Sequence, residues 1–428
     1  MELLLKNCAQ VLTQDKTRNI LKDTDILIKD GIIKELGKNL STAGKIIDCK
    51  DKLVMPGLIN THNHLAMSLF KGYGDDMPLD RWLQEKIWPA EAKLDDGSVR
   101  YGTLFALMEM IKTGTTCFSD MYLSSGAVLS AARSTDIRGF VAYGMIDLGN
   151  PEKTESEIKE ANLFLKNFKS DKTGLIRPML GPHSPYTCSR DLLEKTKKLA
   201  RKNNLQIHIH VSETQKEIDD SIKAKGMRPV EYLNDIGFLD KNTIMAHACH
   251  LSEDEIALIK KSGARISHNP TSNMKLATGG AMPLKELMDA KIPVGLGTDG
   301  SASNNSLDLM GEMKVCALLH KFADNDPETA SAQTVLDLAT IGGAKVLGLE
   351  DKIGSIEIGK QADIILIDLN DTTMIPDHNS VSNIVYSATG SCVDTTIVNG
   401  KILMENKILT TIDQKTVIEK VKEFASKI

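Results

Sequence analysis

The chain has 428 residues, and one barrel of about 250 residues with an accessory domain would account for this length. Apolar residues make up 41% and charged residues 25% of the sequence, a balance that argues against intrinsic disorder. The net charge of -5 provides no cationic surface for a phosphate backbone, so we expect no nucleic-acid partner.

The cysteine pattern and the N-terminal residues indicate in which cellular compartment we expect the protein. The seven cysteines are scattered and form no CxxC pair, which favours free thiols in a reducing cytoplasm over disulfides or a thiolate zinc site. The first residues do not match a signal peptide, because Lys6 soon interrupts a short apolar start. No apolar run approaches the ~18 residues of a membrane span. We therefore expect a cytoplasmic protein with no membrane partner.

Both ends of the chain are predicted to be β-structure. In residues 1–56, Val, Ile and Leu alternate with polar residues, and the Asp30–Gly31 pair predicts a two-residue hairpin. The same pattern returns in residues 362–369 and 395–403. We expect residues 1–56 and 346–428 to form one small β-sandwich domain, with a helix at the C-terminus.

Between these ends, over residues 57–345, candidate strands alternate with amphipathic helices. The candidate strands cover residues 58–64, 114–120, 139–147, 175–183, 206–212, 243–248, 264–269 and 293–299. Eight strands that are each followed by a helix close a (β/α)8 barrel, so the predicted fold is α/β with a TIM-like barrel.

A long insertion follows the first candidate strand. Residues 65–98 precede the next predicted helix and contain both tryptophans of the chain, Trp82 and Trp88. An insertion at this position of a barrel lies over the active-site face. We therefore expect a lid or a substrate wall.

Polar side chains gather at the carboxyl ends of the candidate strands, which converge on the catalytic face of a barrel. These strand-end residues are His62, His64, His183, His208, His210, His247, His268 and Asp299. His62 and His64 are two residues apart, so on a strand both rings face the same way and could bind one metal ion. Taken alone, the pair is a weak signal, because chance or a hydrogen-bonded histidine pair would look the same.

The fifth and eighth strands offer further ligands. His208 and His210 should both face into the barrel, but His210 lies nearer the strand end and is the better ligand. His208 lies one layer deeper, where a buried core histidine is expected. Asp299 ends an apolar strand and could complete a metal site and accept a proton, with a helix cap or a turn as the alternative.

Two residues could handle protons beside this cluster. Glu213 follows His210 by three residues, and burial at the pocket rim would raise its pKa and let it hold a proton; the alternative is a solvated loop residue. His247 is a candidate for orienting a bound water, with packing against the barrel as the alternative. The fourth strand carries no lysine that could bridge two metals, so a single ion is the simpler interpretation. The HxE…PCxxC signature of cytidine-deaminase-like enzymes is also missing from the sequence.

With these residues in view, the chain resembles the amidohydrolase superfamily. Within it, the chain is most similar to the deaminases of 5-methylthioadenosine and S-adenosylhomocysteine, including the archaeal 5'-deoxyadenosine deaminase type. The similarity runs through the whole chain and is carried by PGLINTHNHL (56–65), GPHSPYTCS (181–189), HIHVSET (208–214), AHACHLS (246–252), SHNPTSNMKL (267–276) and GLGTDGSASNNSLDL (295–309).

The resemblance implies one divalent metal ion per chain, with zinc the expected ion. It assigns metal ligation to His62, His64, His210 and Asp299. Asp299 would also accept the proton of the attacking water, and His247 would help to orient that water.

The resemblance also implies the substrate contacts. Glu213 would contact the purine N1 and move protons, His183 would contact the nucleoside, and Asp299 would also contact the substrate. Glu91 would bind the ribose hydroxyls, although the residues alone would make it a solvated helix residue. The expected partners are a small-molecule nucleoside and further copies of the chain in a homo-oligomer, for example a tetramer.

The implied reaction is hydrolytic deamination of 5'-substituted adenosines, with 5'-deoxyadenosine, 5'-methylthioadenosine, S-adenosylhomocysteine and adenosine as substrates. Metal-bound hydroxide would attack the purine C6 and release ammonia and the inosine analogue. Relatives that favour S-adenosylhomocysteine carry arginines after the third strand, whereas residues 143–160 contain none, which favours small apolar 5' groups. Lys153 and Lys159 could substitute for these arginines. The alternatives are guanine or pterin deamination, triazine hydrolysis, or a barrel that only binds.

Overall fold

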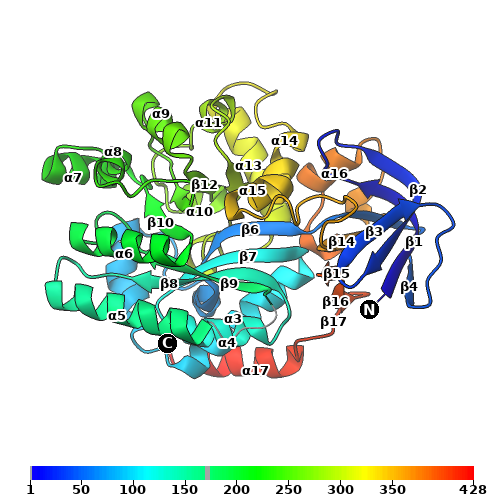
Figure 1. Ribbon diagram of the computed structural model, residues 1–428, viewed down its shortest axis with the longest axis horizontal. Helices are drawn as coiled ribbons and strands as arrows, with labels where there is room; N and C mark the ends of the chain where they lie inside the picture. Colours follow the sequence, from blue (N-terminus) through cyan, green and yellow to red (C-terminus); the bar gives the residue numbers. More distant parts are fainter. Residues whose placement is uncertain (1, 169–173) are drawn as a thin grey trace.

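The computed structural model describes residues 2–168 and 174–428. Figure 1 shows a barrel surrounded by helices and, beside it, a smaller β domain that combines the first and the last parts of the chain. The predicted fold, a TIM-like barrel with a β domain built from both ends, is therefore confirmed.

The barrel sheet has eight parallel strands, and their order in the sheet is their order in the chain. These strands are β6 (Leu58–Asn63), β7 (Thr115–Tyr122), β8 (Arg138–Met145), β9 (Ile176–Pro182), β10 (Ile207–Val211), β11 (Thr243–His247), β12 (Arg265–His268) and β13 (Val294–Leu296). Nearly all their side chains are buried, as expected for a parallel sheet that is covered on both faces. All eight predicted strands are present, with their ends shifted by a few residues.

The barrel closes where its first strand, β6, meets its last strand, β13, and we call this junction the seam. The Thr61 hydroxyl donates to the Leu296 carbonyl oxygen at 2.9 Å, and the Asp299 N–H donates to the His62 carbonyl oxygen at 3.0 Å. Gly295 permits the close approach, because a Cβ at this position would lie 2.7 Å from the Thr61 methyl group. The seam therefore brings Asp299 next to the polar end of β6.

The helices that follow the strands cover the outside of the barrel (Figure 1). They are α3 (Asp96–Lys112), α4 (Ser125–Arg133), α5 (Pro151–Phe168), α6 (Arg190–Asn203), α7 (Gln215–Lys225), α8 (Pro229–Asp235), α9 (Glu253–Ser262), α10 (Pro270–Lys275), α11 (Leu284–Asp289), α12 (Ser301–Asn304), α13 (Leu309–Ala323), α14 (Ala332–Asp337), the π-helical turn η3 (Leu338–Gly342) and α15 (Gly343–Leu347). Local sequence sets their ends. Thr214 and Ser252 cap the first N–H groups of α7 and α9, and left-handed Gly226 and Gly263 end the same two helices.

The insertion after β6 folds into short helical turns. These are the 3-10 helix η1 (Leu65–Phe70), α1 (Leu79–Trp82), the π-helical turn η2 (Leu83–Ile87) and α2 (Trp88–Glu91). Trp82 is buried, whereas Trp88 is partly exposed. The insertion thus has a packed interior of its own and presents its inner side to the barrel mouth.

The β domain is one mixed sheet of nine strands. The N-terminal part supplies β1 (Glu2–Leu12), β2 (Ile20–Lys29), β3 (Ile32–Gly37), β4 (Lys45–Asp48) and β5 (Lys52–Pro56). The C-terminal part supplies β14 (Ile364–Asp368), β15 (Val393–Val398), β16 (Lys401–Glu405) and β17 (Ile408–Leu409), with the short helices η4 (Thr372–Met374), α16 (Ser380–Tyr386) and η5 (Gly390–Cys392). The terminal helix α17 (Gln414–Ala425) lies instead against the barrel helix α3 (Figure 1). The predicted Asp30–Gly31 hairpin joins β2 to β3.

The antiparallel pairing of β5 with β14 joins the two ends of the chain. The sheet branches at β1, which pairs with β2, β4 and β5. Leu5, Ile26, Val54, Ile364 and Ile397 belong to a single core that the two parts of the sheet share. The strands from the two ends of the chain therefore form one continuous hydrogen-bonded sheet.

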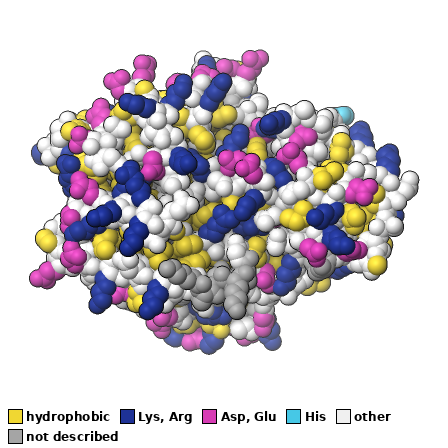
Figure 2. Space-filling view, in the orientation of Figure 1, with side chains coloured by type: hydrophobic (Ala, Val, Ile, Leu, Met, Phe, Trp, Pro, Cys, Tyr) yellow, Lys and Arg dark blue, Asp and Glu magenta, His cyan; other side chains and the backbone are white. Residues whose placement is uncertain are grey.

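The surface carries both signs of charge. Figure 2 shows basic and acidic side chains interspersed over one face of the molecule. Among the residues that the structure describes, no helix is both long and apolar enough to span a bilayer.

A buried ion pair ties the barrel to the β domain. Arg138, at the start of β8, makes two parallel bonds to Asp363, with Nε–Oδ2 at 2.6 Å and Nη2–Oδ1 at 2.9 Å. Both side chains are at most 4% exposed. Asp363 also accepts the backbone N–H of Asn399, and its carbonyl oxygen accepts the N–H of Gly57. Asp363 thus joins β8 of the barrel to the β15–β16 turn and, through its backbone, to the segment that leads from β5 into β6.

Asp363→Asn leaves the Arg138 charge buried without its counter-ion. We expect a loss of about 3–5 kcal/mol in the free energy of unfolding, because an uncompensated buried charge is costly. Urea unfolding followed by circular dichroism measures this loss. Glu194→Gln, which breaks the exposed Arg190–Glu194 pair, serves as the control and should cost under about 1 kcal/mol. Equal, small losses for both variants would contradict a structural role for the buried pair.

Candidate active site

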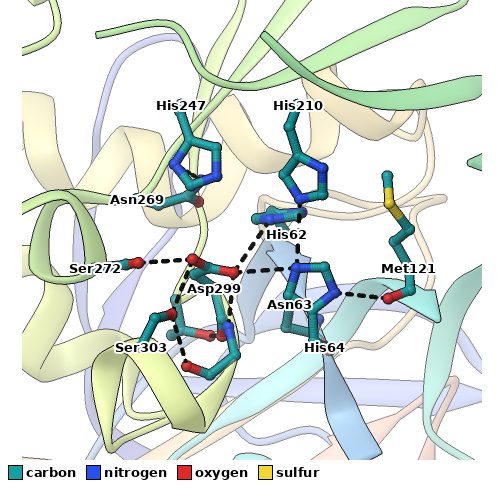
Figure 3. Close-up of polar contacts among 12 residues, drawn as sticks. His62, Asn63, His64, Met121, His210, His247, Asn269, Ser272, Asp299 and Ser303 are labelled. Carbon is teal, nitrogen blue, oxygen red and sulfur yellow. Dashed lines mark hydrogen bonds and ion pairs between the residues drawn. The ribbon is translucent and has the colours of Figure 1, made fainter. Parts of the chain in front are cut away.

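Four histidines and an aspartate meet at the carboxyl ends of the barrel strands. His62 and His64 come from the end of β6, His210 from β10, His247 from β11, and Asp299 from the segment after β13. Figure 3 shows these side chains directed toward one common point. The His62 ring centroid lies 4.8 Å from that of His64 and 4.9 Å from that of His210.

Possible ligand atoms lie close together in this cluster. Asp299 Oδ1 is 3.2 Å from His64 Nε2 and 3.3 Å from His62 Nε2, and His210 Nε2 is 3.4 Å from His64 Nε2. The ligand atoms of His62, His64 and His210 all lie within 4.8 Å of one another, as do those of His62, His247 and Asp299. Imidazole nitrogens and a carboxylate oxygen at this spacing suit a divalent ion such as zinc.

Backbone carbonyls fix the orientation of two of these rings. His64 Nδ1 lies 2.7 Å from the Met121 carbonyl oxygen, and His210 Nδ1 lies 2.7 Å from the His183 carbonyl oxygen. A carbonyl only accepts, so each ring carries its proton on Nδ1 and leaves the Nε2 lone pair free. Both ring nitrogens of His62 are buried without a hydrogen-bond partner among the described residues, and their only polar contact there is that of Nε2 with Asp299 Oδ1 at 3.3 Å. Such buried orphan atoms are rare and fit a position that receives a ligand.

The Asp299 carboxylate is held on three sides. Its Oδ2 accepts the Ser272 hydroxyl at 2.6 Å and the Ser303 hydroxyl at 2.9 Å, and its Oδ1 accepts the Gly300 N–H at 2.8 Å. Its backbone is left-handed, with φ at 59°. Although burial opposes a charge here, the neighbouring histidines hold the pKa of Asp299 well below its usual range. A fixed anion therefore faces the cluster.

Glu213 and His247 lie beside each other on one side of the cluster. Glu213 is only 6% exposed, and its burial raises the pKa of its carboxyl group. Its Oε1 lies 3.8 Å from His247 Nδ1, which in turn lies 2.8 Å from Asn273 Oδ1. Glu213 is thus a buried residue and not a solvated loop residue, and burial favours its protonated form.

A mainly apolar cavity opens from this cluster. Besides the cluster residues, its walls include Met67, Leu79, Trp82, Leu83, Trp88, Glu91, Met121, Tyr122, Leu123, Met145, Ile146, His183, Tyr186 and Leu276. Many of the wall residues belong to the insertion after β6, which therefore forms one wall of this cavity. In the described part of the chain, no lysine or arginine lines this cavity.

Glu91 and His183 both line the cavity. Glu91 ends α2 and is half-buried; burial raises its pKa, while a hydrogen bond from Tyr122 opposes the rise. It is therefore not the solvated helix residue that the sequence alone suggests. His183 Nδ1 lies 2.9 Å from the Thr187 hydroxyl, and burial lowers the His183 pKa to about 3. His183 is thus neutral near pH 7.

Two strand-end histidines lie outside this arrangement. His208 lies below the cluster, with Nδ1 3.1 Å from the Ser119 hydroxyl, in line with the deeper position predicted for it. His268 does not line the cavity, and its Nε2 is 2.9 Å from that of His320 on α13. A strand-end position alone therefore does not bring a histidine into the site.

Sequence reasoning overlooked several supporting residues. Asp120, at the end of β7, accepts the Leu65 N–H at 2.7 Å and so holds the turn that follows His64; burial raises its pKa to about 7. An acidic residue at the end of the second candidate strand was the available signal. Ser272 and Asn273 lie in a segment that matches the resembled family, but nothing in their type indicates which side chain each supports.

The fold and the site together define a metal-dependent hydrolase of the barrel type. The chain belongs to the amidohydrolase family, whose model matches residues 53–403.

Two relatives and one solved structure narrow the comparison. A 5'-deoxyadenosine deaminase of Methanobrevibacter smithii is 49% identical over 401 residues, which cover 93% of this chain and 92% of the relative. A 5-methylthioadenosine/S-adenosylhomocysteine deaminase of Thermococcus onnurineus is 46% identical over 410 residues, covering 96% and 95% of the two chains. An adenosine deaminase from Xanthomonas campestris with bound zinc matches with a TM-score of 0.94 at 32% identity and covers 99% of this chain and 98% of its own.

Proposed function

We propose that this protein is a hydrolytic deaminase of 5'-substituted adenosines, which releases the inosine analogue and ammonia. One observation carries the proposal: a single cavity has the histidine–aspartate cluster and buried Glu213 on its walls together with Glu91. The cluster suits attack on the purine C6, and Glu91 suits the ribose. The adenosine-type names of the relatives support the same substrate class.

The proposed metal ligands are His62, His64, His210 and Asp299, with one zinc ion per chain. The donor set supports this assignment, because free Nε2 lone pairs and one fixed carboxylate face a common point. The described residues of β9 include no lysine that could bridge a second ion. A divalent ion held there would lower the pKa of a water molecule to about 7 and supply a nucleophile at neutral pH.

The residues of the chain divide the proton transfers between them. Asp299, whose carboxylate the Ser272 and Ser303 hydroxyls hold beside the histidines, accepts the proton of the attacking water. Burial raises the pKa of Glu213 and so favours its protonated form. Glu213 donates this proton to the purine N1 as C6 becomes tetrahedral. His247, whose ring is held by Asn273, orients the water. Asp299 then passes its proton to the amino group, ammonia leaves, and the C6 hydroxyl proton restores the Glu213 carboxyl group.

The cavity walls support small, apolar 5' groups. No basic side chain of the described residues lines the cavity, so nothing is placed to bind the carboxylate of a homocysteine tail. Lys153 and Lys159, the possible substitutes, are exposed on α5. Asp147, which follows β8, is itself a carboxylate that accepts the Ser189 and Thr154 hydroxyls. A substrate carboxylate in this region would meet like charge.

Guanine or pterin deamination and triazine hydrolysis remain the alternatives within the family. They would use the same cluster, and Glu91 separates them from the proposed function, because a free base offers no ribose hydroxyls to this carboxylate. We further propose a cytoplasmic homo-oligomer, for example a tetramer. The seven cysteines, which are all buried free thiols, support a reducing location.

Metal analysis of purified variants tests the ligand set. We expect one divalent ion per wild-type chain and loss of that ion in His210→Asn, because this ring presents its free Nε2 to the cluster. His208→Asn, two residues earlier on the same strand, is the matched control and should retain the ion. Two ions per chain, or full activity without metal, would refute the single-ion site.

Glu213→Gln tests the proton donor. Glutamine keeps the shape and the hydrogen bonding of glutamate but cannot cycle a proton. We expect turnover to fall by about 10²-fold or more while the metal content stays the same. A steady-state ammonia-release assay beside elemental analysis measures both. Turnover near the wild-type value would remove Glu213 from the proton pathway.

A substrate panel tests the role of Glu91. We expect 5'-deoxyadenosine and 5'-methylthioadenosine to be good substrates, adenosine to be slower and adenine to be nearly inert, because Glu91 makes charge-assisted bonds to ribose hydroxyls. Glu91→Gln should reduce kcat/KM for nucleosides far more than it reduces metal content. Efficient use of adenine or guanine by the wild-type protein would shift the assignment to the alternative deaminases.

A further inference from the structure

The turn that carries Glu213 is held by a second buried glutamate. Glu217 lies in the first turn of α7 and is 7% exposed. One of its oxygens accepts the N–H of Ser212 at 2.9 Å, and the other accepts the N–H of Glu213 at 2.8 Å. The two carboxylate oxygens thus bind two successive backbone N–H groups.

This arrangement differs from an ordinary capping box. Thr214 caps α7, and its hydroxyl accepts the N–H of Glu217 at 3.1 Å, as in the usual motif. The glutamate of such a box normally returns to the N–H of the cap residue itself. Here the carboxylate reaches past Thr214 to the two residues before it. It therefore fixes the backbone that directs the Glu213 side chain, and not only the helix end.

The other side of the turn is bound to the neighbouring strand. Ser212 has left-handed backbone, with φ at 54°, and its carbonyl oxygen accepts the N–H groups of Cys249 and His250. These residues follow His247 at the end of β11. The segment before Glu213 is thus clamped between the Glu217 carboxylate and the strand that carries His247.

No lysine or arginine of the described residues pairs with Glu217. Burial raises the pKa of its carboxyl group, and the bonds from the Ser212 and Glu213 N–H groups oppose the rise. A buried carboxylate is costly without compensation, and the two backbone N–H groups provide that compensation here. A carboxylate also has two equivalent acceptor oxygens, whereas a glutamine in its place would have one. The site therefore uses the side chain whose acceptors match both N–H groups.

We propose that Glu217 is the positioning residue for Glu213 and sets the direction of the Glu213 carboxyl group toward the substrate. This inference rests on the proposed function, in which Glu213 delivers a proton to the purine. Glu217 does not line the cavity that opens from the cluster. It acts through the backbone of the turn, and its effect on catalysis must therefore disappear when Glu213 can no longer transfer a proton.

A double-mutant cycle of Glu213→Gln and Glu217→Gln tests this dependence. We measure kcat, KM and metal content with 5'-deoxyadenosine. Glu217→Gln alone should lower kcat about 10-fold, since displacement of a catalytic group by a small distance is costly to turnover. KM and metal content should change little. In the Glu213→Gln background, Glu217→Gln should cause no further loss of kcat.

Equal fold-losses of kcat in both backgrounds would overturn the inference, because they would indicate a general structural role. Glu255→Gln is the matched control. Glu255 is a buried glutamate in the first turn of α9 that does not line the cavity. Its carboxylate accepts the N–H groups of Ser252 and Val230 and also pairs with Arg228 at 2.7 Å. We expect Glu255→Gln to lower the thermal stability as Glu217→Gln does but to leave kcat unchanged.

The two proposals fail in different ways. Wild-type turnover in Glu213→Gln alone would contradict the proton-donor role that the proposed function gives to Glu213. Slow turnover in Glu213→Gln with wild-type turnover in Glu217→Gln would overturn only the positioning role. If Glu217→Gln does not accumulate as folded protein, Glu217→Asp, which keeps the charge but shortens the reach, replaces it in the same cycle with the same expected outcomes.

Discussion

The closure of the barrel at the seam is the constraint on which the site depends. The N–H of Asp299 binds the carbonyl oxygen of His62, so the last strand delivers its carboxylate to the histidines of the first. His210 approaches the same cluster from β10, and its ring centroid lies 4.9 Å from that of His62. A single closed sheet thus fixes three separate parts of the chain to within hydrogen-bonding distances, which no loop of comparable length could do without a large cost in conformational entropy.

Much of the fold and part of the site follow from local sequence. The strands can be predicted because burial on both faces requires nearly continuous apolar residues. The histidines can be predicted as site residues because they interrupt that pattern at strand ends. The place of Glu91 in the cavity wall cannot be predicted in this way. Its position depends on how the insertion packs over the barrel mouth, which is tertiary information. His268 shows the opposite limit, because its strand position is favourable but its partner is His320 on an outer helix.

Supporting residues are the hardest to predict, since their partners are distant in sequence and their chemistry is ordinary. Ser272 could donate to almost any acceptor, and only the folded chain shows that it binds Asp299. The same holds for Asn273 and His247. The side chains proposed to transfer protons can therefore be predicted from their residue type and strand-end position. The residues that bind them can be identified only from interatomic distances in the folded chain.

The pairing of β5 with β14 has a consequence for how the protein is made. A ribosome completes the first five strands long before it reaches residue 364, and β5 then lacks its partner while the whole barrel is synthesised. Domains generally fold as units in the order of their synthesis, but the barrel interrupts this β domain in the sequence. The β5 edge of the N-terminal strands therefore gains its β14 partner only after the whole barrel has been synthesised.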